Sequence, residues 1–147
     1  MAYDQDLSFV YFGPTKIVFG NGSSTSELDS EMSALGCSRA VIDSGMDVVD
    51  RAAAFAREKG ADIIISVGGG SAIDTAKCMC ILLTEGGSLA DFEGIQLLTR
   101  PQMPHIVIPT TAGTGSEVTW AAVIYDKSKG QKILIVESYN APRAAIL

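Results

Sequence analysis

Three consecutive glycines at positions 68–70 separate an apolar run from a segment with the pattern of a helix. Residues 61–67, rich in isoleucine, predict a buried strand, and residues 72–83 predict the helix. Glycine allows the backbone to approach an anion closely, and the unpaired amides at the start of a helix attract a phosphate group. These glycines and Ser71 therefore indicate a phosphate-binding turn. A structural βα turn is the alternative, since the spacing matches neither the Gly-x-Gly-x-x-Gly fingerprint nor a Walker loop.

A second loop with similar potential, residues 110–117, follows the strand predicted at residues 105–108. It contains four hydroxyl groups and two glycines, and the spacing Thr114-x-x-Glu117 predicts a capping box. In open α/β sheets ligands lie outside the carboxyl ends of the strands, so both loops are expected at one edge of the sheet. They could hold one extended ligand between them. A solvated Ser/Thr turn is the alternative for this loop taken alone.

The elements that must position these loops alternate between strand and helix, which predicts an α/β, Rossmann-like fold with a mostly parallel sheet flanked by helices. An N-terminal strand pair and a C-terminal β hairpin are expected to complete it. The further strands are predicted at residues 9–12, 16–19, 40–42, 118–125 and 132–136. Helices are predicted at residues 28–35, between Ser44 and Gly60, and as a short turn at residues 89–92.

Composition excludes several classes of protein. A chain of 147 residues has room for one domain, and its net charge of −6 argues against nucleic acid as a partner. No apolar run is long enough to cross a bilayer, and the acidic N-terminus does not resemble a signal peptide. Three cysteines form no disulfide framework, which predicts a reducing, cytoplasmic location. Cys78 and Cys80 diverge on their helix and are interpreted as buried apolar residues.

The motifs of residues 68–77 and 109–119, together with residues 11–16 and 19–20, resemble the iron-containing (group III) alcohol dehydrogenases, which depend on NAD or NADP. The resemblance covers nearly the whole chain. It implies that residues 1–147 form a single dinucleotide-binding domain related to that of dehydroquinate synthase. In the family a helical domain that binds the metal follows, and this sequence does not resemble that second domain.

The resemblance also implies which residues bind the dinucleotide. The pyrophosphate would lie at the glycine turn, the adenosine along the second loop, and the nicotinamide end toward the hairpin. The residues implied are Gly68, Gly69, Gly70 and Ser71 with Asp74 nearby, then Thr110 and Thr111 on the adenosine side, Thr114 and Thr119 toward the diphosphate and nicotinamide end, and Lys132 at the ribose. Without the resemblance, Lys132 would be interpreted as a solvated charge.

Two departures from the family pattern stand out. The chain passes from Ile42 through Asp43 directly into the next helix, so comparison with the family pattern implies that an internal block is missing. Asp43 is either the strand-end carboxylate that binds the adenosine ribose or part of the loop beyond the missing block. The family binds iron through one aspartate and three histidines from the segment after residue 147, whereas this chain has only His105, expected to be structural or solvent-facing. No metal ligand and no catalytic residue is therefore predicted.

Three functional hypotheses follow. The chain is a truncated member of the family that at most binds the dinucleotide, a non-catalytic binding or assembly module, or an enzyme completed in trans by a separate helical chain. Homo-oligomers are also expected, because a domain without its neighbour exposes apolar surface, with residues 9–12 as the candidate dimer seam.

Overall fold

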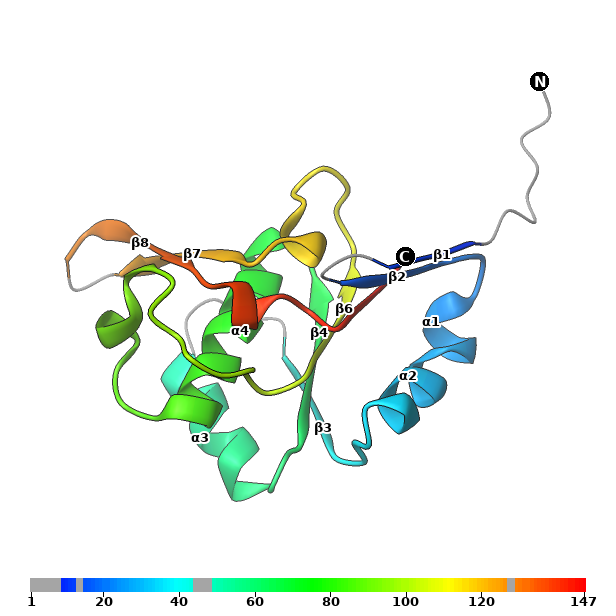
Figure 1. The fold of residues 1–147 in the computed structure, drawn as a ribbon, viewed down its shortest axis with the longest axis horizontal. Helices are drawn as coiled ribbons and strands as arrows, with labels where there is room; N and C mark the ends of the chain where they lie inside the picture. The colour runs from blue at the N-terminus through cyan, green and yellow to red at the C-terminus, as the bar shows by residue number, and fades with distance from the viewer. Residues whose placement is uncertain (1–8, 13–14, 44–48, 127–128) are drawn as a thin grey trace.

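The computed structural model describes residues 9–12, 15–43, 49–126 and 129–147, which form two sheets with the helices packed around them (Figure 1). The larger sheet has the strand order β1-β2-β9-β6-β4-β3, and the smaller has the order β5-β8-β7. The strands of the larger sheet are β1 (Phe9–Phe12), β2 (Lys16–Phe19), β3 (Ala40–Asp43), β4 (Ile63–Gly68), β6 (His105–Pro109) and β9 (Ala144–Ile146). Those of the smaller sheet are β5 (Gly94–Ile95), β7 (Ala121–Asp126) and β8 (Gln131–Val136).

The larger sheet is parallel from β3 to β2, and only β1 runs antiparallel to its neighbour. Helices cover both of its faces, as Figure 1 shows. The helical elements are α1 (Ser23–Ser26), α2 (Leu28–Ala34), α3 (Val49–Glu58) and α4 (Gly70–Glu85), with the 3-10 turns η1 (Leu89–Phe92), η2 (Ser116–Val118) and η3 (Ser138–Asn140). Within the described residues, no helix is both long and apolar enough to cross a membrane.

The alternation of side chains along β4 explains the two layers of the core. Ile63 and Ile65 point to one face, where they pack with residues of β6 and β9 and with α2. Ile64 points to the other face, toward α3 and α4. A strand that is buried on both faces is typical of a parallel sheet, which is why residues 63–65 are all isoleucine.

Helix α4 lies between the two sheets. One side packs against β4, and the other contacts the buried residues of the small sheet through Cys78 and Ile81. Eleven consecutive residues of this helix, from Ala72 to Leu82, are buried. A helix that is buried on all sides in this way is expected only where other elements cover both of its faces. Cys78 and Cys80 are among these buried residues, as the sequence predicted.

Most predicted elements are confirmed, including the antiparallel strand pair at the N-terminus and the hairpin of β7 and β8. The hairpin, however, belongs to the separate small sheet, where the unpredicted two-residue strand β5 joins it. The predicted strand at residues 118–125 begins only at Ala121, because residues 116–118 form the turn η2. Residues 44–48, where the second helix was predicted to begin, lie outside the described residues.

The predicted capping box at Thr114 and Glu117 is wrong. Gly115 precedes the 3-10 turn in the left-handed conformation, with φ 69°, and no side chain caps that turn. The hydroxyl oxygen of Thr114 instead accepts a hydrogen bond from the amide of Ser116 at 3.4 Å. The N-cap of η2 is Gly115, one residue later than the box requires, so Thr114 and Glu117 do not occupy the N-cap and N3 positions of a reciprocal cap.

Candidate functional site

The glycine turn joins β4 directly to α4. Gly68, the last residue of β4, has φ 156°, and a Cβ atom there would lie 2.8 Å from the Cβ of Ala72. Gly69 precedes the helix in an extended conformation, and no side chain caps the first amides of α4. Ser71 is exposed on the first turn. The 16-residue helix thus begins with uncapped amides at a turn without side chains, which suits an anion.

The second loop lies against this turn. A Cβ atom on Gly69 would lie 3.0 Å from the hydroxyl oxygen of Thr111, and one on Gly70 would lie 3.1 Å from the Cβ of Thr114. The amide of Thr110 donates to the carbonyl of Gly68 at 3.0 Å. The side chains of all three threonines are exposed. The structure therefore brings the two predicted loops together at the carboxyl ends of the paired strands β4 and β6.

Asp43 lies at the same edge of the sheet. It is the last residue of β3 and pairs in register with Ser66 of β4, two residues before the glycine turn begins. A strand-end residue on the strand beside the glycine turn is where Rossmann-like folds place the residue that contacts the adenosine ribose. Both predicted readings of Asp43 stay predictions.

Asp74 is placed differently from the exposed residues. Its side chain is buried, and Oδ2 accepts a hydrogen bond from the amide of Val123 on β7 at 3.0 Å. The structure therefore directs this carboxylate to β7, and a contact with the dinucleotide stays a prediction.

Lys77 was not predicted as a functional residue. Its side chain is fully buried, and Nζ donates to the carbonyl of Ala121 at 2.8 Å and lies 3.7 Å from Oδ1 of Asp74. Burial lowers the pKa of Lys77 to about 8, although the charges of Asp74 and Glu117 oppose this change. The signal in the sequence was a lysine directly before the six apolar residues 78–83 of the predicted helix, because a charge buried with such a run needs partners.

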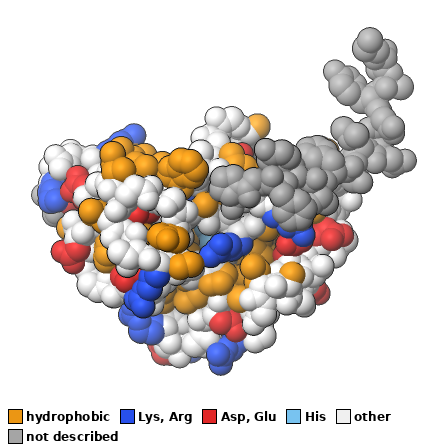
Figure 2. Space-filling model, viewed as in Figure 1, with side chains coloured by type: hydrophobic (Ala, Val, Ile, Leu, Met, Phe, Trp, Pro, Cys, Tyr) orange, Lys and Arg blue, Asp and Glu red, His pale blue; other side chains and the backbone are white. Residues whose placement is uncertain are grey.

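Thr119 and Lys132 belong to the other end of the site. Thr119 is exposed between η2 and β7, and Lys132 is exposed on β8, where it pairs in register with Tyr125. The outward face of the hairpin also exposes Val123 and Leu134, at 41% and 47%. Figure 2 shows hydrophobic side chains gathered over this hairpin. The signal in the sequence was the unbroken apolar run of residues 121–125, because a strand with such a run places apolar side chains on both of its faces.

His105 is buried in the larger sheet, so the structural expectation is confirmed and the solvent-facing one is wrong. Its Nε2 lies 2.8 Å from the hydroxyl oxygen of Ser66 on the adjacent strand. Burial lowers the pKa of His105 to about 3, and the charge of Lys77 adds to the effect. The histidine is therefore neutral at ordinary pH, and it begins β6 at the end of the strand opposite the glycine turn.

The described residues do not fit an iron site. They contain no group of three or more His, Cys, Asp or Glu side chains placed to hold a metal ion. A catalytic metal needs about three protein ligands and an open position. The one histidine of the sequence is already bonded to Ser66.

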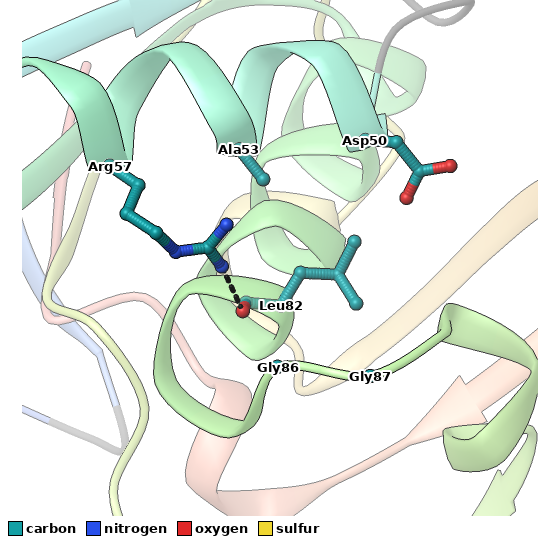
Figure 3. Close-up of a pocket in the computed structure, with 6 residues that line it drawn as sticks. All are labelled: Asp50, Ala53, Arg57, Leu82, Gly86 and Gly87. Carbon is teal, nitrogen blue, oxygen red and sulfur yellow. Dashed lines mark hydrogen bonds between the residues drawn. The ribbon is translucent and has the colours of Figure 1, made fainter.

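A hollow of about 360 Å³ lies between α3 and the C-terminal end of α4 (Figure 3). It is lined by Asp50, Ala53, Arg57, Leu82, Gly86 and Gly87. Nη2 of Arg57 donates to the carbonyl of Leu82 at 2.9 Å, and the same carbonyl also accepts from the amide of Gly86 at 3.0 Å. None of the predicted site residues lines this hollow, which lies at the end of α4 that is remote from the glycine turn.

A mostly parallel sheet with helices on both faces, and a glycine turn that opens a helix beside a polar loop, define a Rossmann-like α/β domain. Within this class the chain belongs to the iron-containing alcohol dehydrogenase family, whose model matches residues 43–147. The matched segment contains both loops and the hairpin. The resemblance inferred from the motifs is thereby confirmed.

Individual relatives agree with this assignment. The sulfoacetaldehyde reductase of Bilophila wadsworthia is 41% identical over 108 residues, which are 74% of this chain and 28% of that protein. A solved 1,3-propanediol oxidoreductase matches with a TM-score of 0.81 and 28% identity, over 96% of this chain and 45% of that one. The sulfoacetaldehyde reductase of Bifidobacterium kashiwanohense, solved in complex with NAD+, has a TM-score of 0.81 and 29% identity, over 92% of this chain and 45% of that one. The chain thus spans less than half the length of these relatives.

Proposed function

We propose that this chain binds a nicotinamide dinucleotide, NAD or NADP, across the carboxyl ends of β4 and β6. The observation that supports this most directly is the packing of the second loop on the glycine turn, where Thr111 and Thr114 lie against Gly69 and Gly70. Two phosphate-compatible loops at one sheet edge suit an extended, doubly charged ligand. The similar sulfoacetaldehyde reductase solved with NAD+ supports the choice of ligand.

Each end of the dinucleotide has its own residues in this proposal. Gly69, Gly70 and Ser71 bind the pyrophosphate through backbone amides and one hydroxyl group. Asp43 accepts hydrogen bonds from the adenosine ribose, and Thr110 and Thr111 line the adenosine side. Thr114, Thr119 and Lys132 orient the nicotinamide half. When bound, the nicotinamide ring supplies the hydride chemistry, and the role of these residues is to hold it in place.

We further propose that the chain is the cofactor-binding part of an alcohol or aldehyde oxidoreductase. The family and the names of its relatives support this class of reaction. The match of the family model begins at residue 43, which supports the proposal that a block of the family is missing near this point. Because the described residues do not fit an iron site, the proposed activity of this chain alone is limited to binding the dinucleotide.

Titration with NADH and with NADPH, followed by fluorescence or calorimetry, tests the central proposal. We expect saturable binding of at least one of the two. No saturable binding at millimolar cofactor would contradict it. An alcohol oxidation assay with ferrous iron tests the proposal that the chain alone only binds the dinucleotide. Turnover by the purified chain would contradict that proposal.

A second candidate function is a non-catalytic assembly module that keeps the fold for its surfaces. The exposed apolar residues of the hairpin face and its surroundings favour it, including Trp120 at 43% and Ile95 at 68% exposure. Such a surface could associate with another copy or with a helical chain that supplies the iron ligands in trans.

Cys37, Cys78 and Cys80 are free thiols, which agrees with a reducing, cytoplasmic location.

A further inference from the structure

Two side chains of α4 make hydrogen bonds to backbone groups on the outer edge of β7. In the small sheet β7 pairs with β8 along one edge only. On the other edge, the carbonyl of Ala121 accepts from Lys77 and the amide of Val123 donates to Asp74. An edge strand ordinarily presents such groups to water or to another strand. Here α4 satisfies two of them, on alternate residues of the strand.

The two side chains that make these bonds are charged and buried. Lys77 has no exposed surface and Asp74 has 8%, and their charged atoms lie 3.7 Å apart. Glu117 of η2 is close enough to act electrostatically on Lys77 as well. Burying charges is costly even when they are paired, so apolar residues at these positions could pack at least as well. The buried pair of Asp74 and Lys77 therefore has a role other than stabilising the contact between α4 and the hairpin.

Cohesion between α4 and the hairpin already comes from apolar contacts. Cys78 and Ile81 of the helix pack with Ala122, Ile133 and Ile135 of the hairpin. Such contacts are non-directional, and hydrophobic surfaces alone do not specify one register. Hydrogen bonds from the helix to two alternate backbone groups do specify one, because moving the strand by a single residue would break both. The pair fixes where the hairpin lies along α4.

The register of the hairpin along α4 matters for the proposed site, because α4 follows the glycine turn and the hairpin carries residues of the nicotinamide end. Asp74 and Lys77 follow the glycine turn on the same rigid helix. Ala121 and Val123 closely follow Thr119, and the same hairpin carries Lys132. Any displacement of the hairpin along α4 would therefore change the separation between the pyrophosphate end and the nicotinamide end of the proposed site.

We propose that Asp74 and Lys77 are positioning residues, which fix the β7–β8 hairpin on α4 so that one dinucleotide can reach both the glycine turn and the hairpin. The inference rests on the proposed dinucleotide site. It also assigns Asp74 a role through β7 in place of direct contact with the dinucleotide.

The test compares a ligand that needs both ends with one that needs only the first. The dissociation constants of NADH and of ADP-ribose are measured for the unchanged chain and for Asp74→Ala and Lys77→Met. We expect the affinity for NADH to fall by about tenfold or more, and that for ADP-ribose by less than about threefold, because misplacing one end penalises only the longer ligand. Asp74→Asn keeps an oxygen that can accept from Val123 and should recover much of the loss.

A matched control changes an acid on the same helix away from the turn. Glu85→Gln loses an exposed ion pair with Arg100 and should leave both affinities unchanged. Equal losses for NADH and ADP-ribose, or no loss for NADH in Asp74→Ala, would overturn the inference. If the unchanged chain binds neither ligand, the proposed function fails first and the inference fails with it.

Amide hydrogen exchange in the unchanged chain tests the same contact without any substitution. The amide of Val123 faces away from β8, so it should exchange at the slow rate of the β4 and β6 amides only if Asp74 holds it. Exchange at the rate of an exposed loop would overturn the inference even if the variants do not fold.

Discussion

The contacts that an added Cβ atom would make explain why Gly68 and Gly70 of the glycine turn are glycines. At Gly68 an added methyl group would meet Ala72 at 2.8 Å with φ at 156°, so both contact and backbone conformation require glycine. At Gly70 the atoms nearest to an added methyl group would be side-chain atoms of Thr114 and Ser116, at 3.1 and 3.2 Å. The first glycine therefore serves the fold, and the other permits the close approach of the second loop.

Gly70→Ala should separate binding from stability. Alanine favours the helix over glycine by about 1 kcal/mol, so the melting temperature should stay the same or rise. The methyl group displaces the second loop, and the affinity for NADH should fall by roughly tenfold, equivalent to about 1.4 kcal/mol. Calorimetric titration and a thermal melt measure the two effects. Gly68→Ala is the contrasting variant, expected to lower the melting temperature, and an unchanged NADH affinity in Gly70→Ala would contradict the role given to this contact.

His105 makes stability depend on pH. Its pKa is lowered to about 3 in the folded chain and is 6.5 in the unfolded one, so the unfolded state binds a proton first as the pH falls. Stability is therefore complete above pH 6.5 and is lost as the pH falls from 6.5 toward 3, by about 1.4 kcal/mol per pH unit. Urea unfolding between pH 7 and 5, roughly above the range of ordinary carboxylates, should show this slope. In His105→Gln it should flatten, and an identical slope in both proteins would exclude the histidine as the cause.

At the scale of elements, a buried carboxylate holds the small sheet together. Glu137 has no exposed surface and accepts hydrogen bonds from the amides of Leu97 and Leu98, the second at 3.1 Å. Just before them, Gln96 has φ 56°, the only positive value among the described residues other than glycine. The carboxylate thus compensates for an unfavourable backbone conformation and keeps β5 beside β8.

Glu137→Ala should destabilise the chain by about 2–4 kcal/mol, because it leaves one buried and one part-buried amide without an acceptor. Urea unfolding measures the change, and Glu137→Gln, which keeps one acceptor oxygen, should lose less. Glu58→Ala serves as the control. The side chain of Glu58 is largely exposed, so its removal should change the free energy of unfolding by less than about 0.5 kcal/mol. A stability change for Glu137→Ala as small as that of the control would contradict this account.

At the scale of the molecule, the chain combines a closed core with an open apolar surface. The core on both faces of the larger sheet is continuous and well buried. The hairpin face, in contrast, exposes Val123, Tyr125 and Leu134. In the two solved relatives the part that matches this chain makes up 45% of the whole. A surface of this kind suits contact with a second body of protein.

The proposed oligomer is tested by light scattering across a range of protein concentrations. We expect a mass above that of the monomer, increasing with concentration, because burying an exposed apolar face is favourable. Strand β1, at the edge of the larger sheet, is the proposed seam. A monomer at every concentration would contradict the proposal.

Local sequence patterns determined much of this protein. The glycine turn, the polar loop of residues 110–117 and the order of strands and helices follow from propensities and periods that neighbouring residues encode. Because ligands of open α/β sheets lie outside the carboxyl ends of the strands, the order of strands and loops also predicted that both loops lie at one edge of the sheet. The site could be predicted to this extent because each loop follows directly from its own strand.

Only the tertiary structure decided which partners the buried polar groups have. Nothing near Asp74 in the sequence indicates the amide of Val123, and nothing near Glu137 indicates the amides of residues 97 and 98. The two-residue strand β5 has no pattern of its own, and it exists because β8 lies beside it. Propensity acts over a few neighbouring residues, whereas a buried charge is stabilised by whichever groups the completed fold places around it.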